Sequence, residues 1–396
     1  MFRLLDDAYK GEKDGRVVLG NGNNGLWVNI SKETFRKIKD SIERNDNNFL
    51  IQKCEPLIRA GILTEEQKNE DSLETLMIAI TNRCNLRCLH CGFEAGPNVE
   101  NELDTQEVIK IIENNLYLKE ITITGGEPLV HPGFFEISNY LKCQFNGKKI
   151  LMTNATLINE CNVAKIADAY DEISISIDGA QEESCDLMRG KGTFQRVMEA
   201  ISLLKEVGKE EISLSMTLTD INLYEEETFK KLCRKLHVQP MIRDLFSVGR
   251  AKKNKKILEI ERTDVPINIT RDELMEECKR IKVNGKCSAG RKSIYLQYDG
   301  SIYPCPVAAV RTEFKMASLN STQYELKSIV DDKANCGYKK FAAISPKKIQ
   351  KCKECDVNDF CWGCLQEYYT FVENDANFKT FCERQKKNLS QAIWRN

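Results

Sequence analysis

The sequence has no long apolar run and no excess of one charge. No stretch of its 396 residues approaches the roughly 18 apolar residues of a membrane span. Asp6 and Asp7 interrupt the apolar residues after Met1, so we expect no signal peptide. Lys and Arg number 58 against 59 Asp and Glu, which argues against nucleic-acid and membrane partners. We therefore expect a cytoplasmic protein, with the basic run 252–256 as a solvated loop.

Histidine is scarce, whereas cysteine is abundant. His90, His131 and His237 are the only imidazoles, and none lies in a catalytic pattern, so no catalytic acid or base is assigned. The chain has 17 Cys. In a chain without export signals, so many thiols favour metal binding or redox chemistry over disulfides. This predicts a reducing, anaerobic cytoplasm.

Three cysteines stand close together in one predicted loop. Cys84, Cys88 and Cys91 follow the apolar run 76–80 at a spacing of Cys-x3-Cys-x2-Cys. Three soft thiolates suit either zinc or an iron–sulfur cluster. A structural zinc site normally takes four protein ligands, so three cysteines predict a site with one position left for another molecule.

Strand and helix patterns alternate between residues 75 and 245. The expected strands are 76–81, 120–124, 149–152, 172–178, 212–218 and 238–244, and the expected helices are 105–114, 132–141, 158–167, 193–207 and 223–236. This alternation predicts an α/β fold whose parallel sheet curls toward a barrel through right-handed crossovers. The cysteine loop follows the first strand, so the chemistry is expected where the carboxyl ends of the strands meet.

The cysteine loop resembles the cluster loop of the radical S-adenosylmethionine (SAM) enzymes, with His90 just before the third cysteine. In that family three cysteines bind a [4Fe-4S] cluster, and SAM chelates the fourth iron. The resemblance implies a partial (β/α)6 TIM barrel and SAM as a cofactor. A zinc knuckle or chance clustering in a cysteine-rich chain is the alternative.

Further segments resemble the SAM-binding elements of that family. A Gly-Gly-Glu-Pro loop follows the second strand and resembles the element that binds the SAM amino group. Ala155 replaces the usual glycine after Asn154. Arg189 is a candidate partner of the SAM carboxylate, with a surface salt bridge as the alternative. The implied SAM-binding residues are His90, Gly125, Gly126, Glu127, Pro128, Asn154, Ser176, Asp178 and Arg189.

A second set of cysteines resembles the SPASM domain, which carries auxiliary [4Fe-4S] clusters. Its candidate ligands are Cys278, Cys287, Cys305, Cys352, Cys355, Cys361, Cys364 and Cys382. The resemblance assigns Cys287, Cys305 and Cys364 to an inner cluster, with Cys278 as the eighth ligand if it reaches. It assigns Cys352, Cys355, Cys361 and Cys382 to an outer cluster. Two residues, where the family commonly has three, separate Cys361 from Cys364; a pair of zinc sites is the alternative.

The N-terminal segment resembles a small PqqD-like, winged-helix-type element that binds leader peptides. Strand-like runs at 16–20 and 25–30 precede Ser31, which is expected to cap a helix, and Gly61 ends a second amphipathic stretch. A capping extension of the barrel is the alternative. The predicted domains are 1–74 (PqqD-like or capping), 75–250 (radical SAM barrel), 251–276 (bridging region) and 277–396 (SPASM).

Together these resemblances imply an enzyme that cleaves SAM reductively and uses the 5′-deoxyadenosyl radical to modify a ribosomally made precursor peptide. They imply three [4Fe-4S] clusters, a Cys-containing peptide with a leader, and a flavodoxin- or ferredoxin-type electron donor. Cys thioether formation is the predicted outcome. Carbon–carbon cross-linking to a cyclophane and anaerobic sulfatase maturation to formylglycine are alternatives, although Pro306 stands where the sulfatase-maturating group has Asp. A non-enzymatic iron–sulfur electron carrier is the alternative from another class.

Overall fold

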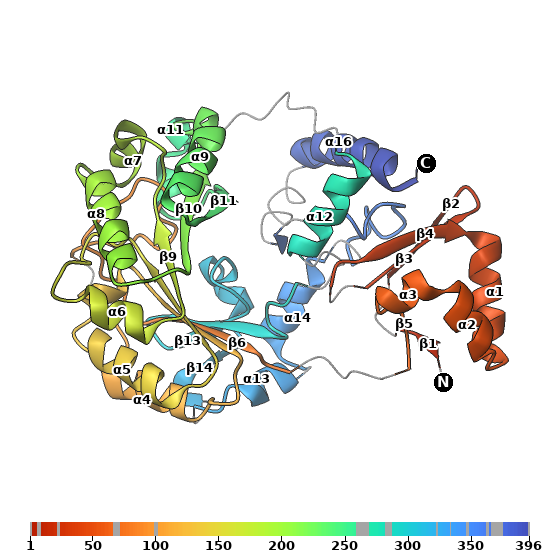
Figure 1. The fold of residues 1–396 in the computed structure, drawn as a ribbon, viewed down its shortest axis with the longest axis horizontal. Coiled ribbons are helices and arrows are strands. Elements are labelled where there is room, and N and C mark those ends of the chain that lie inside the picture. The colour runs from red at the N-terminus through yellow and green to blue at the C-terminus, as the bar shows by residue number, and fades with distance from the viewer. Residues whose placement is uncertain are drawn as a thin grey trace. The chain divides into compact units, whose positions relative to one another are not determined.

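The chain folds into two compact units, each built from segments far apart in the sequence (Figure 1). The computed structural model describes residues 2–5, 9–21, 24–65, 72–98, 102–258, 269–281, 287–321, 324–332, 334–345, 348–361, 364–365 and 375–394. We call residues 71–262 with 289–339 the barrel unit, and residues 1–70 with 263–288 and 340–396 the terminal unit. The domain limits given above stay a prediction.

Six parallel strands form the centre of the barrel unit and follow one another in chain order. They are β6 (Thr75–Ala79), β7 (Glu120–Thr124), β8 (Lys148–Thr153), β9 (Glu172–Ser176), β10 (Ile212–Leu218) and β11 (Gln239–Asp244). The connecting helices are α4 (Thr105–Glu113), α5 (Phe134–Gln144), α6 (Val163–Ala169), α7 (Glu182–Arg189), α8 (Thr193–Glu206) and α9 (Glu226–Leu236). The α/β prediction with a parallel sheet of six βα units is confirmed, although α7 was not predicted.

A hairpin from late in the chain extends the same sheet. β12 (Ser293–Leu296) pairs in parallel with β6, so that Tyr295 lies opposite Met77. β13 (Ser301–Tyr303) and β14 (Ala317–Ser318) follow in antiparallel pairing. Gly300 turns the hairpin with a φ of 78°, a value that favours glycine. The hairpin predicted around the Asp-Gly turn is therefore present, and it belongs to the barrel sheet.

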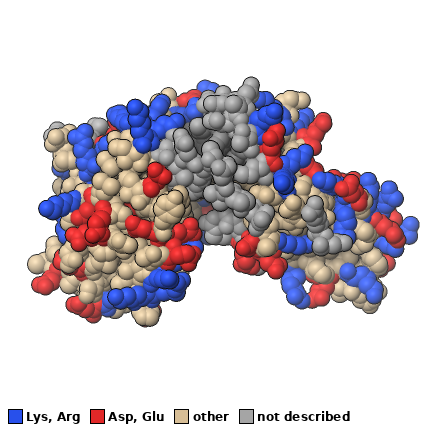
Figure 2. Space-filling model, turned by 90° about the horizontal axis from the view of Figure 1, so that it is seen from above, with Lys and Arg blue, Asp and Glu red and all other residues tan. Residues whose placement is uncertain are grey.

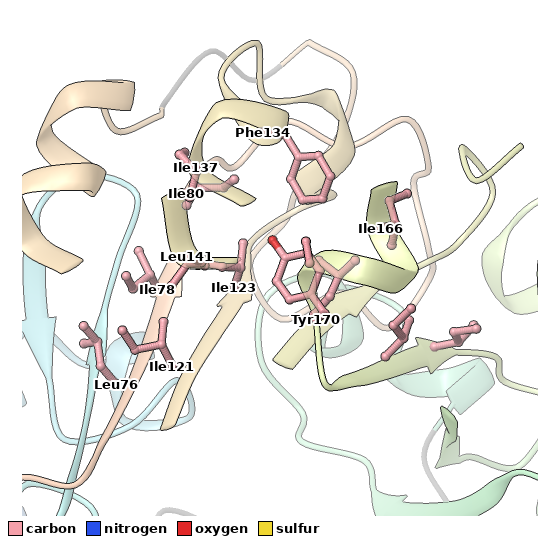
Figure 3. Packing of buried hydrophobic residues seen from close by; sticks show 14 of the residues in the cluster. Leu76, Ile78, Ile80, Ile121, Ile123, Phe134, Ile137, Leu141, Ile166 and Tyr170 are labelled. Atoms are coloured by element: carbon pink, nitrogen blue, oxygen red, sulfur yellow. The ribbon is translucent and has the colours of Figure 1, made fainter. Parts of the chain in front are cut away.

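Alternate residues of the strands build the core of the barrel unit. Leu76, Ile78 and Ile80 lie beside Ile121 and Ile123 of the next strand, under α5 (Figure 3). The Tyr170 hydroxyl, which is buried beneath α5, lies 2.8 Å from Ser138 Oγ. Because side chains alternate across a strand, the intervening residues face the other side of the sheet. Several of these are small and polar: Thr122, Ser174 and Ser213.

The N-terminal part of the terminal unit combines an antiparallel sheet with three helices. Its strands are β2 (Tyr9–Lys13), β3 (Arg16–Gly20) and β4 (Trp27–Ser31), and β1 (Arg3–Leu4) pairs with β5 (Leu63–Thr64). Its helices are α1 (Lys32–Glu43), α2 (Asn47–Lys53) and α3 (Glu55–Arg59). Ser31 caps α1 as predicted, since its Oγ accepts a 2.9 Å hydrogen bond from Thr34 N. The predicted second amphipathic stretch is divided at Cys54 into two helices.

The N-terminal sheet shares a core with the C-terminal segments of the same unit. Trp27 lies edge-on to Phe360 with ring centroids 5.2 Å apart, in a cluster that includes side chains of α12 (Arg271–Ile281) and α16 (Asp375–Trp394). Lys13 Nζ lies 2.5 Å from Asp356 Oδ2, and Asn29 Nδ2 donates to the Ile393 carbonyl at 2.7 Å. The N-terminal element and the segment that carries Cys352–Cys361 therefore form one body.

The remaining described helices are short and lie in the second half of the chain. They are α10 (Arg250–Lys253), α11 (Lys255–Leu258), α13 (Lys327–Asp331) and α14 (Cys336–Ala343). Within the described ranges, no helix is long and apolar enough to cross a membrane. Figure 2 shows basic and acidic side chains interspersed on the face that it draws, as the balanced charge of the sequence suggests.

Candidate functional site

The three cysteines predicted to bind a cluster lie together in the loop after β6. Cys84 and Cys88 are buried, Cys91 is half-buried, and all three pack with Leu86 and Ala95. Burial raises the pKa of the Cys84 thiol to about 12, and it raises the pKa of Cys88 as well. Metal ligation requires thiolates, so a bound metal would supply the positive charge that this buried loop needs to hold them.

The spacing of the potential metal ligands that the structure describes does not suit a single ion. Within the part of the chain that the structure describes, no three His, Cys, Asp or Glu side chains are placed to hold one metal ion. A four-iron cluster sets a different requirement, because each of its cysteines binds a different iron.

A buried charge network lies beside the cysteine loop. Asp178 follows β9 and is fully buried, and its Oδ2 lies 2.7 Å from Arg189 Nε and 3.1 Å from His90 Nε2. The backbone N–H of Thr217 donates to Asp178 Oδ1 at 2.8 Å. Burial lowers the pKa of His90, whereas Asp178 opposes that shift. Arg189 was weighed as a surface salt bridge; the structure places it instead in a buried pair, with 8% of its surface exposed.

The Gly-Gly-Glu-Pro loop packs directly on the residues that precede Cys84. Gly126 N donates to the Thr81 carbonyl at 2.8 Å, and Glu127 N donates to the Arg83 carbonyl at 2.9 Å. A Cβ atom on Gly125 would lie 2.4 Å from Thr81 O, and one on Gly126 would lie 2.2 Å from Arg83 O. The two glycines therefore allow the backbone of the cysteine loop to approach closely, and their predicted contact with SAM stays a prediction.

Glu127 connects that loop to the end of β8. Its carboxylate is fully buried and accepts hydrogen bonds from Thr153 Oγ1 and Asn154 N, both at 2.7 Å, and from Leu129 N at 3.2 Å. Burial raises the pKa of Glu127 to about 6, although each of these hydrogen bonds lowers it. The carboxylate therefore joins the Gly-Gly-Glu-Pro loop to the end of β8. Pro128 begins the short 3-10 helix that follows, Pro128–Val130.

Asn154 connects the hydrogen bonds of Glu127 to Cys84 of the cysteine loop. Its Nδ2 lies 2.9 Å from Asn85 Oδ1 and 3.8 Å from Cys84 Sγ. Ala155 has a φ of 60°, which explains why glycine is usual after this asparagine in the family that the sequence resembles. Ser176 ends β9 half-buried, in register with Ser215 of β10. The structure thus places Asn154 against the cysteine loop and Ser176 at the carboxyl end of its strand.

Polar atoms at this edge remain available to a ligand. Among the described residues, His90 Nδ1 and Asn82 Oδ1 are buried without a hydrogen-bond partner. Arg189 Nε and Asp178 Oδ2 lie at ion-pair distance but do not make a well-directed hydrogen bond to each other. Buried polar atoms normally have partners, so this edge suits a polar ligand. SAM carries an ammonium, a carboxylate and ribose hydroxyls, so the donors and acceptors present here fit it.

The four thiols predicted to bind the outer cluster gather in the terminal unit. Burial, followed by the neighbouring thiols of Cys355, Cys382 and Cys352, raises the pKa of Cys361 to about 12. Cys352 and Cys382 also pack in one apolar cluster. The four thiols assigned together from the resemblance are therefore electrostatic neighbours, although they are spread over 31 positions of the sequence.

The remaining cysteines predicted to bind metal belong to different units. Cys287 and Cys364 belong to the terminal unit, and Cys305, which follows β13, belongs to the barrel unit. Cys278 is fully buried on α12, in the apolar cluster that contains Phe360. The inner cluster and the eighth ligand therefore stay predictions.

Sequence reasoning missed the contact of Arg250 with the cysteine loop. The run 252–256, expected to be a solvated loop, lies in α10 and α11, and the side chain of Arg250, just before it, donates hydrogen bonds to the cysteine loop. A single arginine after a strand carries no signal in the sequence, because its partners lie more than 100 residues away.

Comparisons with known proteins identify both cysteine regions. Residues 78–235 match the radical SAM superfamily, and residues 287–356 match the SPASM iron–sulfur cluster-binding domain. The chain is 28% identical over 310 residues to the antilisterial bacteriocin subtilosin biosynthesis protein AlbA of Bacillus subtilis, covering 72% of this chain and 65% of AlbA. It is 28% identical over 191 residues to the mycofactocin maturase MftC of Mycolicibacterium smegmatis, covering 48% of this chain and 49% of MftC.

Among solved structures, the chain resembles SuiB of Streptococcus suis bound to S-adenosylmethionine. The TM-score is 0.59 at 15% identity, covering 94% of this chain and 97% of SuiB. SuiB bound to its precursor peptide SuiA gives a TM-score of 0.57 at 15% identity, covering 95% and 98%. At this identity the likeness shows the fold, which is that of radical SAM proteins.

These domains establish the cofactors. A radical SAM domain binds a [4Fe-4S] cluster and SAM, and a SPASM domain binds auxiliary iron–sulfur clusters. The predicted cofactor classes are confirmed, whereas the ligand assigned to each iron stays a prediction.

Changing Asp178 to Asn should destabilise the barrel unit strongly. The substitution keeps the shape and the hydrogen bond from Thr217 but leaves the buried Arg189 charge without its counter-charge, a loss of about 3–5 kcal/mol. Chemical unfolding under anaerobic conditions measures the change. Asp168→Asn is the matched control, because it removes a carboxylate from an exposed pair with Lys142 and should cost less than about 1 kcal/mol. Equal effects of the two substitutions would contradict the buried pairing.

Changing Glu127 to Gln should reduce stability in a pH-dependent way. A Gln amide would point an N–H group at the N–H of Asn154, at a cost of about 1–3 kcal/mol. The folded-state pKa of Glu127, about 6, lies above 4.5, so wild-type protein gains stability from this group as the pH falls through 6. The gap in melting temperature between wild type and variant should widen from about pH 7.5 to about pH 5.5. Glu113→Gln, at an exposed carboxylate, should show no such trend, and a constant gap for Glu127→Gln would refute the raised pKa.

Proposed function

We propose that this chain, a radical SAM protein with a SPASM domain, is an enzyme that modifies a ribosomally made precursor peptide. The observation that carries the proposal is the gathering of Cys84, Cys88 and Cys91 beside the buried pair of Asp178 and Arg189 at the carboxyl ends of β6 and β9. AlbA and MftC are named for the biosynthesis of a bacteriocin and of mycofactocin, and SuiB has been solved with a precursor peptide. The chain spans 65% of AlbA and 49% of MftC, so its substrate is inferred rather than transferred.

Each element of the site has a role in this function. Cys84, Cys88 and Cys91 would hold three irons, and Arg189 would receive the SAM carboxylate. When bound, the cluster and SAM supply a 5′-deoxyadenosyl radical, which takes a hydrogen atom from the peptide. Glu127 and Asn154 keep the surrounding loops in place, and the buried walls restrict the access of water to the radical.

Thioether formation is the reaction that we infer for the peptide. It removes two hydrogens: one leaves as an atom, and the other leaves as a proton from the Cys thiol together with one electron. The sulfur forms a bond to a Cα or Cβ carbon, and the electron needs an acceptor that the auxiliary clusters would supply. A flavodoxin- or ferredoxin-type protein is proposed to deliver the electron that starts each SAM cleavage.

The N-terminal element is proposed to bind the leader of the precursor. Its β2–β4 sheet and helices α1–α3 have the size and order of a winged-helix-type element. One face of its sheet packs with its own helices in a core formed by residues such as Leu19, Ile38 and Leu57, so the element has a fixed shape before any peptide arrives. A preformed surface spares part of the ordering cost of binding an extended peptide.

The substrate proposal predicts a defined product from anaerobic turnover. Purified protein with SAM, a reductant and a Cys-rich peptide encoded beside its gene should release 5′-deoxyadenosine and a peptide that has lost two hydrogens per cross-link. A thioether consumes a thiol, so alkylation of Cys should fail at the modified residue. A carbon–carbon cross-link would keep the thiol, and formylglycine would react with a hydrazine.

Matched variants separate chemistry from folding in that assay. Replacing Cys84, Cys88 and Cys91 by Ala should abolish 5′-deoxyadenosine, because no cluster remains to cleave SAM. Replacing the exposed Cys143 and Cys161 should leave turnover unchanged. Deoxyadenosine formed by the triple variant would refute the radical assignment, and intact SAM cleavage with no peptide changed would refute the peptide substrate.

Removing residues 1–70 should weaken peptide binding while reductive SAM cleavage continues, because the cysteine loop lies in the barrel unit. Binding is measured by fluorescence anisotropy with the labelled precursor, and we expect a loss of roughly tenfold or more. The deletion also removes Trp27 from Phe360, so full-length Trp27→Ala is the control for damage to the outer thiol segment. Unchanged affinity after the deletion would assign residues 1–70 to the capping role.

A further inference from the structure

A short segment after β11 holds the cysteine loop from one side. We call residues 249–254 the clamp; it comprises Gly249, α10 and Asn254. Neither the motifs of the sequence nor the matched domains, which end at 235 and resume at 287, include it. Its contacts nevertheless fall on the stretch that contains Cys88 and Cys91.

The clamp donates hydrogen bonds to four carbonyls of the cysteine loop. Arg250 Nε donates to Cys88 O at 2.8 Å, its Nη2 to Ala95 O at 2.7 Å, and its backbone N–H to Cys91 O at 3.0 Å. Asn254 Nδ2 donates to Leu89 O at 2.9 Å. The loop has no helix or strand of its own here, so these bonds replace the regular pairing that its carbonyls lack.

The clamp approaches so closely that its first position requires glycine. Gly249 has a φ of 55°, and a Cβ atom there would lie 2.3 Å from Gly92 O and 2.8 Å from Cys91 O. From this close position the forked guanidinium of Arg250 donates to carbonyls on both sides of Cys91, those of Cys88 and Ala95. A planar guanidinium makes two such bonds in a fixed geometry, which a lysine ammonium does not reproduce.

We propose that Arg250 is a positioning residue for the SAM-binding cluster. Its fork fixes the backbone between Cys88 and Ala95, and thereby the separation of the Cys88 and Cys91 sulfurs, and its positive charge favours the reduced, more negative state of the cluster. The inference rests on the cluster alone and not on the proposed peptide substrate. Its test therefore needs no peptide, and its failure would leave the substrate proposal untouched.

Two substitutions separate the fork from the charge. Arg250→Gln removes both, whereas Arg250→Lys keeps the charge and removes the fork. The clamp offers a matched control in Lys252→Gln, which removes an exposed positive charge from the same helix. Each protein is reconstituted anaerobically at full length, and far-UV circular dichroism checks its fold.

Two measurements report on the cluster without turnover. The first is the rate of iron loss to a chelator. The second is the midpoint potential of the electron paramagnetic resonance signal that changes when SAM is added, which identifies the cluster with an open iron. Arg250→Gln should lose iron from this cluster roughly 10–100-fold faster and should show a lower midpoint potential. Arg250→Lys should lose iron faster at an unchanged potential, and Lys252→Gln should match wild type in both.

Unchanged iron loss in both Arg250 variants would overturn the positioning role. An unchanged potential in Arg250→Gln would overturn the electrostatic part, as would an equal fall of the potential in Lys252→Gln. If Arg250→Gln does not fold, Arg250→Lys decides the geometric part by itself, because it retains the charge that the surrounding loop needs.

Discussion

The buried carboxylate of Asp178 is the constraint on which the functional edge of the barrel depends. A charge without access to water must stay paired, and Asp178 is paired with Arg189 at the end of α7 and lies within ion-pair distance of His90 in the cysteine loop. Its second oxygen accepts from Thr217 of β10, and its backbone carbonyl accepts from Asn222. Four segments of the chain therefore meet at one side chain. A shift of these segments would expose the Asp178 carboxylate to water or leave the buried Arg189 without its counter-charge.

The cysteine loop gains its order from neighbours rather than from its own secondary structure. The Gly-Gly-Glu-Pro loop contacts its beginning, Asn154 contacts Cys84, and the clamp contacts its later half. These contacts come from chain segments that follow different strands, so the shape of the loop depends on the parallel sheet that positions those segments. Because the loop is already ordered, its cysteines lose little conformational entropy when a cofactor binds, which favours binding.

The sequence predicted what local patterns and familiar spacings determine. The six parallel strands followed from alternating apolar runs, and the cap of α1 followed from one serine before an amphipathic stretch. Helix α7 was missed because Glu182–Arg189 is short and mostly polar. The pairing of β12 with β6 and the contacts of Arg250 join residues that are more than 100 positions apart, so no local pattern encodes them. The glycines of the Gly-Gly-Glu-Pro loop were recognised from the resemblance, but their close approach to the backbone of Thr81 and Arg83 was not predicted.

The edge-on contact between Trp27 and Phe360 couples two parts of the terminal unit. Phe360 directly precedes Cys361, so the indole of the N-terminal sheet rests one residue from a predicted iron ligand. A displacement of the chain at Cys361 would therefore reach the N-terminal sheet through this ring contact, whereas the barrel unit has a core of its own.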